Sequence, residues 1–509
     1  MNSLVELLRL RALEKPDAPF VFFKDEEWSR GELDRASDGA AWQLRLSGVK
    51  PGDRVAMLMP NCPEFAAYYF AILKAGGVAV PINVWLKEPE IVYILGNSGA
   101  SGVVLGPSHH AHEAGFLAQC PGLRFAKKAE LPSKEELLRL PAGDPAALAA
   151  AATGGASPVT IIYTSGTTGF PKGAVLSHRN WLADVEGFVA LAAMSSADRV
   201  LAFLPLFHVN SQCIALVCPL FVGGSVVLME KFAPKEFFEN LSRHRCTVFS
   251  GVPSIYTVLL SLPEAERYDL SSLRFCICGA APIAVDVFER FEAKFKAHIL
   301  EGYGLSESTC VASANPPPPG RRKVGSIGLP CPGQEMRIVD DAGRTLPDGQ
   351  VGEIAVRGEN VMQGYWENPK ATAEALRDGW LHTGDLGTRD ADGYFYIAGR
   401  KKEMLIRGGE NIYPREIEEA LYAHPAVLEA AVVGLPDRRY GEEVAAFISL
   451  KEGAAVTPKE LTAFLKDRLA DYKVPRRFEF VTGFPKTATG KIQKLKLRER
   501  YLARAADPA

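Results

Sequence analysis

The chain carries a run of glycines and hydroxyl residues, YTSGTTGFPKG at residues 163–173, whose types suit phosphate binding. Glycine lets backbone N–H groups approach an anion closely, serine and threonine hydroxyls add donors, and Lys172 adds a positive charge. The spacing differs from GxxxxGK[ST], which excludes the nucleotide loop of kinases and GTPases. Because apolar TIIY precedes this run and AVLSHRN leaves it, we predict a phosphate loop between a strand and a helix.

Six further motifs follow in a fixed order, and the set resembles one family. They are LPLFHVN (204–210), GAAP (279–282), EGYGLSES (301–308), GWLHTGD (379–385), YIAGRKKEMLIRGGENIYPREIE (396–418) and KTATGK (486–491). Together with the loop they resemble the adenylate-forming superfamily of acyl-CoA synthetases, peptide-synthetase adenylation domains and luciferases. The resemblance spans roughly residues 160–500. Within the superfamily, the sequence most resembles bacterial acyl-CoA synthetases of the fatty-acid or carnitine type.

The resemblance implies a nucleotide site whose residue types also make physical sense. Tyr303, an aromatic side chain between two glycines, would stack on adenine, because small neighbours leave room for a flat ring. Asp385 would accept hydrogen bonds from both ribose hydroxyls, and Arg400 would reach the ribose and phosphates. The residues implied to bind ATP or AMP are Thr164, Ser165, Gly166, Thr167, Thr168, Gly169, Lys172, Gly279, Ala280, Ala281, Pro282, Glu301, Gly302, Tyr303, Gly304, Asp385, Ile397 and Arg400.

The same resemblance implies which residues catalyse the two half-reactions. Glu307 and Thr168 would hold Mg²⁺, which needs few protein ligands when it bridges phosphates. Lys491 would compensate charge while the carboxylate attacks the α-phosphate. Lys402 occupies the family's hinge position, where a domain rotation would exchange the two active arrangements. The residues implied to line the CoA tunnel are Arg407, Gly408, Gly409, Glu410 and Asn411.

The acyl site is expected around His208, which resembles the family's gate beside the acid and also fits a core histidine bonded to backbone. Candidate pocket residues are His208, Val209, Asn210, Ser211, Val252, Pro253 and Gly302 to Leu305. Many relatives have glycine two residues after the histidine, whereas Asn210, Ser211 and Gln212 add polarity here. Phe207 is followed by histidine and not by the aspartate that holds an amino group in related domains, which argues against an α-amino acid. A fatty or related acyl acid, an aryl acid and a carnitine-like acid remain open.

Strand-like and helix-like segments alternate through the first 400 residues, which indicates an α/β fold with parallel sheets covered by helices. From about residue 330 turn sequences such as PDGQVGE indicate a mostly antiparallel β subdomain. We predict a large N-terminal domain, 1–399, of two αβαβα-type sheet layers plus a β subdomain at about 330–398. A hinge at 400–402 would join it to a small mobile α+β C-terminal domain, 403–509. The expected strands are 54–59, 77–82, 101–106, 160–165, 199–205, 225–230, 246–251 and 274–279.

Composition narrows the class of protein. The 509 residues exceed one ordinary core, and 47% hydrophobic with 23% charged residues is the balance of a globular protein. A net charge of −2 argues against binding to nucleic acid or anionic lipid. No secretory signal or membrane span is visible, and nine scattered cysteines fit buried thiols in a reducing cytoplasm. The run 473–504 holds ten basic and two acidic residues, either a solvated face or an anion-binding surface.

The sequence therefore predicts an AMP-forming acid:CoA ligase that uses ATP, Mg²⁺ and CoA. Delivery to the pantetheine of a carrier protein is an alternative acceptor, and free CoA is favoured because no carrier domain is fused. Luciferase-like oxidation of the adenylate has no support beyond the shared motifs. A non-catalytic nucleotide-binding relative is disfavoured because Lys491, Glu307, Thr167, Thr168 and Lys172 are all present. The acid, the acceptor and the oligomeric state, monomer or homodimer, stay open.

Overall fold

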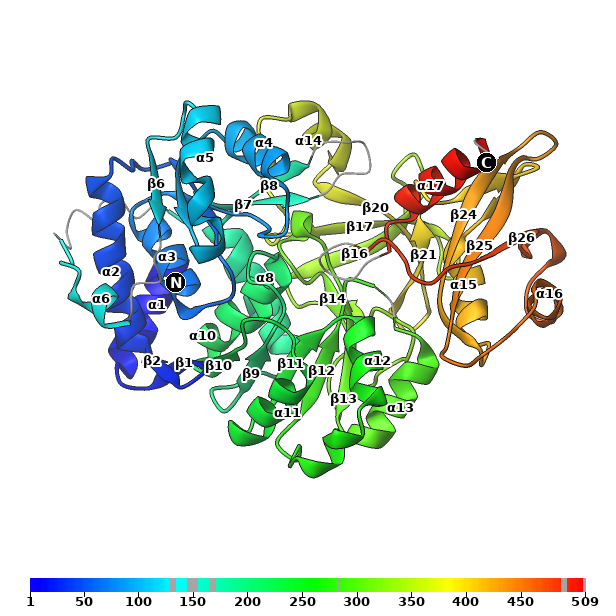
Figure 1. The fold of residues 1–509 in the computed structure, drawn as a ribbon, viewed down its shortest axis with the longest axis horizontal. Coiled ribbons are helices and arrows are strands. Elements are labelled where there is room, and N and C mark those ends of the chain that lie inside the picture. Colours follow the sequence, from blue (N-terminus) through cyan, green and yellow to red (C-terminus); the bar gives the residue numbers. More distant parts are fainter. Residues whose placement is uncertain (129–133, 144–153, 165–170, 282, 487–491, 507–509) are drawn as a thin grey trace.

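The computed structural model describes residues 1–128, 134–143, 154–164, 171–281, 283–486 and 492–506. A large N-terminal domain holds two extensive sheets, and a small C-terminal domain, orange to red at the right of Figure 1, lies beside it. The α/β architecture predicted from the sequence is confirmed.

The first large sheet is nine-stranded, in the order β15-β14-β13-β12-β11-β9-β10-β1-β2. Its centre is parallel from β1 to β13, and antiparallel strands close both edges. The strands are β1 Pro19–Phe23, β2 Glu26–Ser29, β9 Arg199–Ala202, β10 Ser225–Leu228, β11 Val248–Gly251, β12 Phe275–Cys278, β13 His298–Tyr303, β14 Ser313–Ala314 and β15 Leu329–Pro330.

The second large sheet is seven-stranded, in the order β18-β8-β7-β4-β3-β5-β6. It is parallel from β7 to β6, and β8 and β18 add antiparallel strands at one edge. The strands are β3 Arg54–Leu58, β4 Val78–Pro81, β5 Ala100–Leu105, β6 Phe125–Lys128, β7 Pro158–Thr164, β8 Lys172–Ser177 and β18 Gly364–Tyr365. All eight strands expected from the sequence are present in the two sheets.

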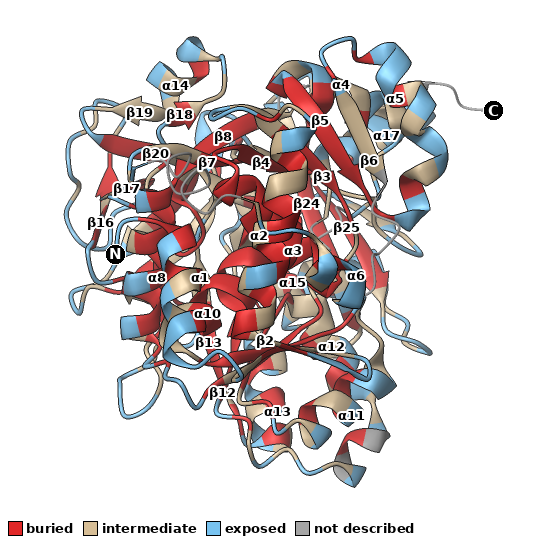
Figure 2. Ribbon diagram, turned by 90° about the vertical axis from the view of Figure 1, so that its left-hand side faces the viewer, coloured by how far each residue is buried: buried red, intermediate tan, exposed pale blue. Residues whose placement is uncertain are grey.

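Helices fill three layers around the two sheets. Side chains alternate along each strand, so Val200 of β9 faces the central layer while Leu201 faces the outer helices. Helix α3 is buried on every side because it lies in the central layer between the sheets. Figure 2 shows this buried centre in red with exposed helix faces outside. The αβαβα-type layering is therefore confirmed.

The helices of the large domain divide by layer. The central layer holds α1 Leu4–Glu14, α2 Arg30–Leu46, α3 Pro63–Lys74, α8 His178–Leu191, α9 Val209–Ser211, the π-helical segment η2 Gln212–Val217 and α10 Cys218–Val222. The outer layers hold α4 Glu88–Ser98 and α5 Glu113–Gln119 on the seven-stranded sheet, and α11 Pro234–Arg243, α12 Pro253–Ser261 and α13 Val285–Phe295 on the nine-stranded sheet. Shorter helices are η1 Pro107–His112, α6 Lys134–Arg139, η3 Pro263–Arg267, η4 Ser306–Ser308 and α14 Pro369–Ala375.

A five-stranded sheet follows the nine-stranded one along the chain and pairs antiparallel throughout, as the turn sequences predict. Its strands are β16 Gln334–Val339, β17 Gly352–Gly358, β19 Leu376–Arg377, β20 Trp380–Arg389 and β21 Phe395–Arg400. Strand β21 carries the chain to the small domain, since turn bonds from Glu403 and Met404 to the Arg400 carbonyl follow directly.

The small domain has one sheet covered on both faces. Helices α15 and α16 pack on one face of β24 and β25, and α17 packs on the other. Its elements are β22 Leu405–Arg407, β23 Glu410–Ile412, α15 Pro414–Tyr422, β24 Val427–Asp437, β25 Gly441–Leu450, α16 Pro458–Lys466, η5 Asp471–Lys473, β26 Arg477–Phe480 and α17 Lys494–Ala506. We propose the boundaries 1–399, 400–402 and 403–509 for the two domains and their hinge.

All nine cysteines are free and buried. Two of them help to hold the central layer together: Cys213 of η2 donates to Asp184 of α8 at 3.2 Å, and its sulfur lies 3.8 Å from that of Cys218. The backbone N–H of Val311 donates to the other Asp184 oxygen at 3.0 Å. Among the described residues, no helix is long and apolar enough to cross a membrane.

Candidate functional site

The two ends of the expected phosphate loop face each other across a hairpin. Strand β7 enters and β8 leaves, with Thr164 opposite Lys172 in the antiparallel register. Helix α8 begins only after β8, and Ser177 caps it by accepting from the Asn180 N–H. A second strand thus separates the loop from the predicted helix. Ser165, Gly166, Thr167, Thr168 and Gly169 lie outside the described residues.

Glu307 lies beside this hairpin mouth and is held by Tyr365. The Tyr365 hydroxyl donates to Glu307 Oε1 at 2.7 Å, and Lys172 Nζ lies 5.2 Å from the centre of the Tyr365 ring. Tyr365 reaches this point because β18 pairs with β8, which places Tyr365 opposite Ala174. One tyrosine therefore links the expected metal carboxylate to the lysine of the phosphate loop.

The expected adenine-binding residues meet at the carboxyl ends of two neighbouring parallel strands. Strands β12 and β13 pair with Cys278 opposite Glu301, so residues 279–281 emerge beside residues 302–304. Pro282 lies outside the described residues. Gly304 tolerates no side chain, because a Cβ there would lie 1.6 Å from the Cys310 carbonyl oxygen. The small residues thus keep the backbone close-packed around Tyr303.

Three residues form a connected polar group at this edge. The Tyr303 hydroxyl donates to Asp385 Oδ2 at 2.7 Å, and Arg400 Nε lies 3.1 Å from Asp385 Oδ1. Asp385 and Arg400 face each other because β20 and β21 pair antiparallel in that register, and Ile397 lies on β21 opposite Gly387. The sequence expectation that these side chains share one site agrees with this geometry.

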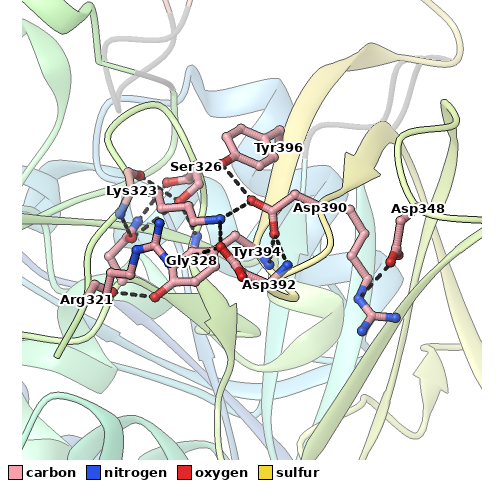
Figure 3. Close-up of polar contacts among 11 residues, drawn as sticks. Arg321, Lys323, Ser326, Gly328, Asp348, Asp390, Asp392, Tyr394 and Tyr396 are labelled. Carbon is pink, nitrogen blue, oxygen red and sulfur yellow. Dashed lines mark hydrogen bonds and ion pairs between the residues drawn. The ribbon is translucent and has the colours of Figure 1, made fainter.

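A salt-bridge network supports the strand behind Tyr303 (Figure 3). Lys323 pairs with Asp390 and with Asp392, the latter at 2.7 Å, so the loop before β15 is tied to the turn before β21. The backbone N–H of Lys323 also donates to Asn315 Oδ1, and the Asn315 side chain donates to the Glu301 carbonyl. These contacts join β13 and β21, which carry Tyr303 and Arg400.

Glu301 differs from its neighbours because its side chain is buried without full pairing. Its Oε2 has no hydrogen-bond partner in the described part of the chain. Burial raises the pKa of this carboxyl group to about 7, while the charge of Arg415 on α15 opposes the shift. The Glu301 side chain therefore interacts electrostatically with Arg415 of the small domain. Its backbone carbonyl accepts a hydrogen bond from the Asn315 side chain.

The expected CoA-tunnel residues form a hairpin on the small domain. Gly408 and Gly409 join β22 to β23, and both have positive φ, 61° and 93°, as a two-residue hairpin turn requires. Arg407 makes a two-pronged ion pair with Glu443, at 2.7 and 3.0 Å, while residues 408–411 are exposed. Lys402 lies on the exposed turn between β21 and β22. Lys491 lies outside the described residues.

Part of the basic run at the carboxyl end is paired with carboxylates. Lys473, Lys486 and Lys494 each pair with a glutamate between residues 403 and 429. These contacts favour a structural role for this part of the run over a free anion-binding surface.

The segment that contains His208 adjoins the nucleotide edge. Asn210 Oδ1 accepts from the Ser250 hydroxyl of β11 at 3.0 Å, and Ser211 donates to the Leu204 carbonyl at 2.8 Å. Val252 and Pro253 follow β11 directly, and the Gly251 carbonyl accepts from the Gly279 N–H at 3.4 Å. The acyl-pocket candidates therefore lie beside the adenine-binding candidates.

The His208 ring is neutral at ordinary pH, because burial lowers its pKa to about 4. Its Nε2 is buried without a hydrogen-bond partner. The role of His208 as a gate beside the acid or as a core histidine bonded to backbone stays a prediction.

Two residues of the site have no strong signal in the sequence. Tyr365 is one aromatic residue after a glycine, and Ser250 is one serine in a buried strand. Only their contacts, with Glu307 and with Asn210, identify them.

Comparison with family models gives two matches that together span most of the chain. The AMP-binding enzyme family matches residues 8–366, and the C-terminal domain of AMP-binding enzymes matches residues 416–491.

Known relatives match almost end to end. The chain is 39% identical to a sulfoacetate–CoA ligase of Cupriavidus necator, over 97% of both chains. It is 37% identical to a long-chain-fatty-acid–CoA ligase of Bacillus subtilis, over 98% of this chain and 94% of the relative. The solved anthranilate CoA ligase in complex with anthranoyl-AMP superposes with a TM-score of 0.91 at 31% identity, over 99% and 98% of the two chains. The chain therefore belongs to the AMP-binding enzyme family and is an AMP-forming acid–CoA ligase.

Proposed function

We propose that this ligase forms an acyl-adenylate where β12, β13 and the segment 208–211 meet, and then transfers the acyl group to the thiol of CoA. The observation that carries the proposal is the polar group of Tyr303, Asp385 and Arg400 at the edge where the acyl segment also ends. An aromatic ring, a carboxylate and a guanidinium suit a base, a ribose and a phosphate respectively.

In the first half-reaction, the chain's residues would hold ATP for in-line attack by the acid. Asp385 would exchange its Tyr303 bond for ribose hydroxyls, and Lys172 and Arg400 would compensate phosphate charge. The neutral His208 ring would donate a hydrogen bond from its N–H to the acid's carboxylate. Positioning and charge compensation supply most of the rate in such phosphate displacements.

Glu307 fits a divalent metal ion. Its Oε1 accepts from Tyr365, which fixes the carboxylate, and neither oxygen has an ion-pair partner within the described residues. Glu307 and Thr168 would hold Mg²⁺, which would supply charge neutralisation to the phosphates.

In the second half-reaction, the small domain would rotate at Lys402. The Gly408–Gly409 hairpin is exposed in this arrangement, and rotation would carry it to the adenylate beside the pantetheine arm of CoA. The backbone at a pair of glycines can approach such a chain closely. The nine buried free thiols support location in a reducing compartment such as the cytoplasm.

The test measures pyrophosphate and AMP release from ATP·Mg²⁺ with a panel of carboxylic acids, each with and without CoA. CoA-dependent turnover supports the ligase. Pyrophosphate release without a CoA effect would favour a carrier-protein acceptor. A folded, ATP-binding protein that releases no pyrophosphate with any acid would contradict the proposal.

Lys491→Ala separates the half-reactions. We expect about a 10²–10³-fold loss of adenylate formation, because one charge-compensating donor is removed. Thioester formation from supplied acyl-adenylate should stay near wild type. Lys486→Ala is the matched control, because Lys486 pairs with Glu429 at 2.6 Å. Equal losses in both half-reactions would refute the role of Lys491.

A further inference from the structure

The segment from His208 to Gln212 holds several polar groups with no partner. Among the residues that the structure describes, His208 Nε2 is buried and has no partner, and Gln212 is fully buried with neither polar side-chain atom bonded. Buried polar atoms in native proteins are nearly always paired, so unpaired ones in a single turn call for an explanation. The π-helical bonding that starts at Gln212 marks the same turn, and such irregular turns are frequent at functional sites.

Asn210 is oriented so that its donor is available. Its Oδ1 accepts the Ser250 hydroxyl at 3.0 Å, and its Nδ2 donates no hydrogen bond to any described residue. Ser250 thus acts as a positioning residue, and Asn210 offers an N–H₂ group.

A small cavity lies against this amide. Asn210, Ser211 and Ser250 line it together with apolar residues, which are Val200, Leu201, Ala202, Phe203, Leu204, Ile214 and Ala215. Its volume is about 10 Å³, which holds about one water-sized group. None of these lining residues is basic, so an anionic group here would stay unpaired at the end of β9 and β11.

We infer that the acid carries a neutral hydrogen-bond acceptor, such as a hydroxyl, keto or amide oxygen, at the end away from its carboxylate, and that Asn210 selects it. This rests on the proposed function, and it narrows the substrate class. An alkyl tail would leave the Asn210 donor unpaired, and a site built for a polar group rejects analogues that lack it. An alkyl chain offers no acceptor to this donor, so the inference departs from the fatty acid that the sequence resemblance suggested.

The experiment compares four acids of equal carbon number, and one long-chain acid, at the wild-type enzyme. Butyrate, 4-hydroxybutyrate, succinamate, succinate and dodecanoate are assayed for CoA-dependent pyrophosphate release, and kcat/KM is measured for each. We expect the hydroxyl or amide acid to exceed butyrate, succinate and dodecanoate by at least about 10-fold. Preference for an alkyl, anionic or long-chain acid would overturn the inference while leaving the ligase intact. No release with any acid would overturn the proposed function and the inference with it.

Variants then test the residue itself. Asn210→Leu should lower kcat/KM for the polar acid by about 10-fold or more and leave butyrate unchanged or improved. Asn210→Asp, which keeps the shape and removes the donor, should give the same loss. Ser250→Ala should lose about three- to tenfold, because the amide loses its orienting partner. Asn240→Leu on α11 is the control outside the pocket. An unchanged ratio of polar to alkyl acid in Asn210→Leu and Asn210→Asp would refute the assignment.

Discussion

The nucleotide end and the acyl end of the site differ in how their polar groups are satisfied. At the nucleotide end, Asp385 accepts a hydrogen bond from Tyr303 and pairs with Arg400, and Glu307 accepts a hydrogen bond from Tyr365. At the acyl end, His208 and Gln212 hold buried polar atoms without partners. The chain thus fixes the nucleotide half through its own contacts, whereas the acid must complete the acyl half. Changes at the first end should affect every acid alike, and changes at the second should alter the choice among acids.

The largest expected effect is at the nucleotide end. Asp385→Ala removes the acceptor shared by Tyr303 and Arg400, and each bond to a charged group is worth about 1.5–3 kcal/mol. We expect kcat/KM for ATP to fall about 10²–10³-fold with every acid, measured by pyrophosphate release. The order of preference among acids should not change.

Asp348→Ala is the control for that loss. Asp348 lies on a surface turn of the same sheet, 3.8 Å from Arg389, and its replacement should leave ATP use near wild type. A reordering of acid preference by Asp385→Ala would break the separation between the two ends.

Glu301 is the exception at the nucleotide end, and it predicts a pH dependence. Because burial raises its pKa from 4.5 to about 7, the stability it contributes is full below pH 4.5 and is lost as the pH rises through 7. Glu301→Gln removes this loss. Between pH 4.5 and 8, the free energy of unfolding of the variant should therefore rise by up to ~3 kcal/mol relative to that of the wild type.

Urea unfolding at pH 5 and pH 8 measures that difference. Glu335→Gln, at an exposed glutamate paired with Arg357, should show no comparable trend. An equal difference between Glu301→Gln and wild type at both pH values would contradict a buried, titrating carboxyl group.

The smallest expected effect is at the contact that holds Glu307. Tyr365→Phe removes the hydroxyl and keeps the ring beside Lys172, so we expect about a 10-fold loss in kcat/KM with a raised requirement for Mg²⁺. A magnesium titration of pyrophosphate release checks this. Tyr396→Phe, which removes a hydroxyl that donates to Asp390, is the matched control. A wild-type magnesium requirement in Tyr365→Phe would show that Tyr365 does not position Glu307.

The fold was largely predictable from local pattern. Segments such as RVAMLM and RFCICG form β3 and β12, because short β-branched and apolar runs between helices suit buried parallel strands. Strand β8 was missed as a separate element. Its residues AVLS follow the phosphate loop directly, and only pairing with β7 and β18 makes them a strand.

For the site, the sequence by itself determined the family motifs and hence the residues at the nucleotide end, since Tyr303, Glu307, Asp385 and Arg400 each lie in a recognisable run. The tertiary structure decided what those residues touch. Tyr365 reaches Glu307 through strand pairing, and Ser250 of β11 donates to Asn210 of α9, which lies 40 residues earlier in the chain. Such contacts depend on register and packing between distant segments, which local residue type does not specify.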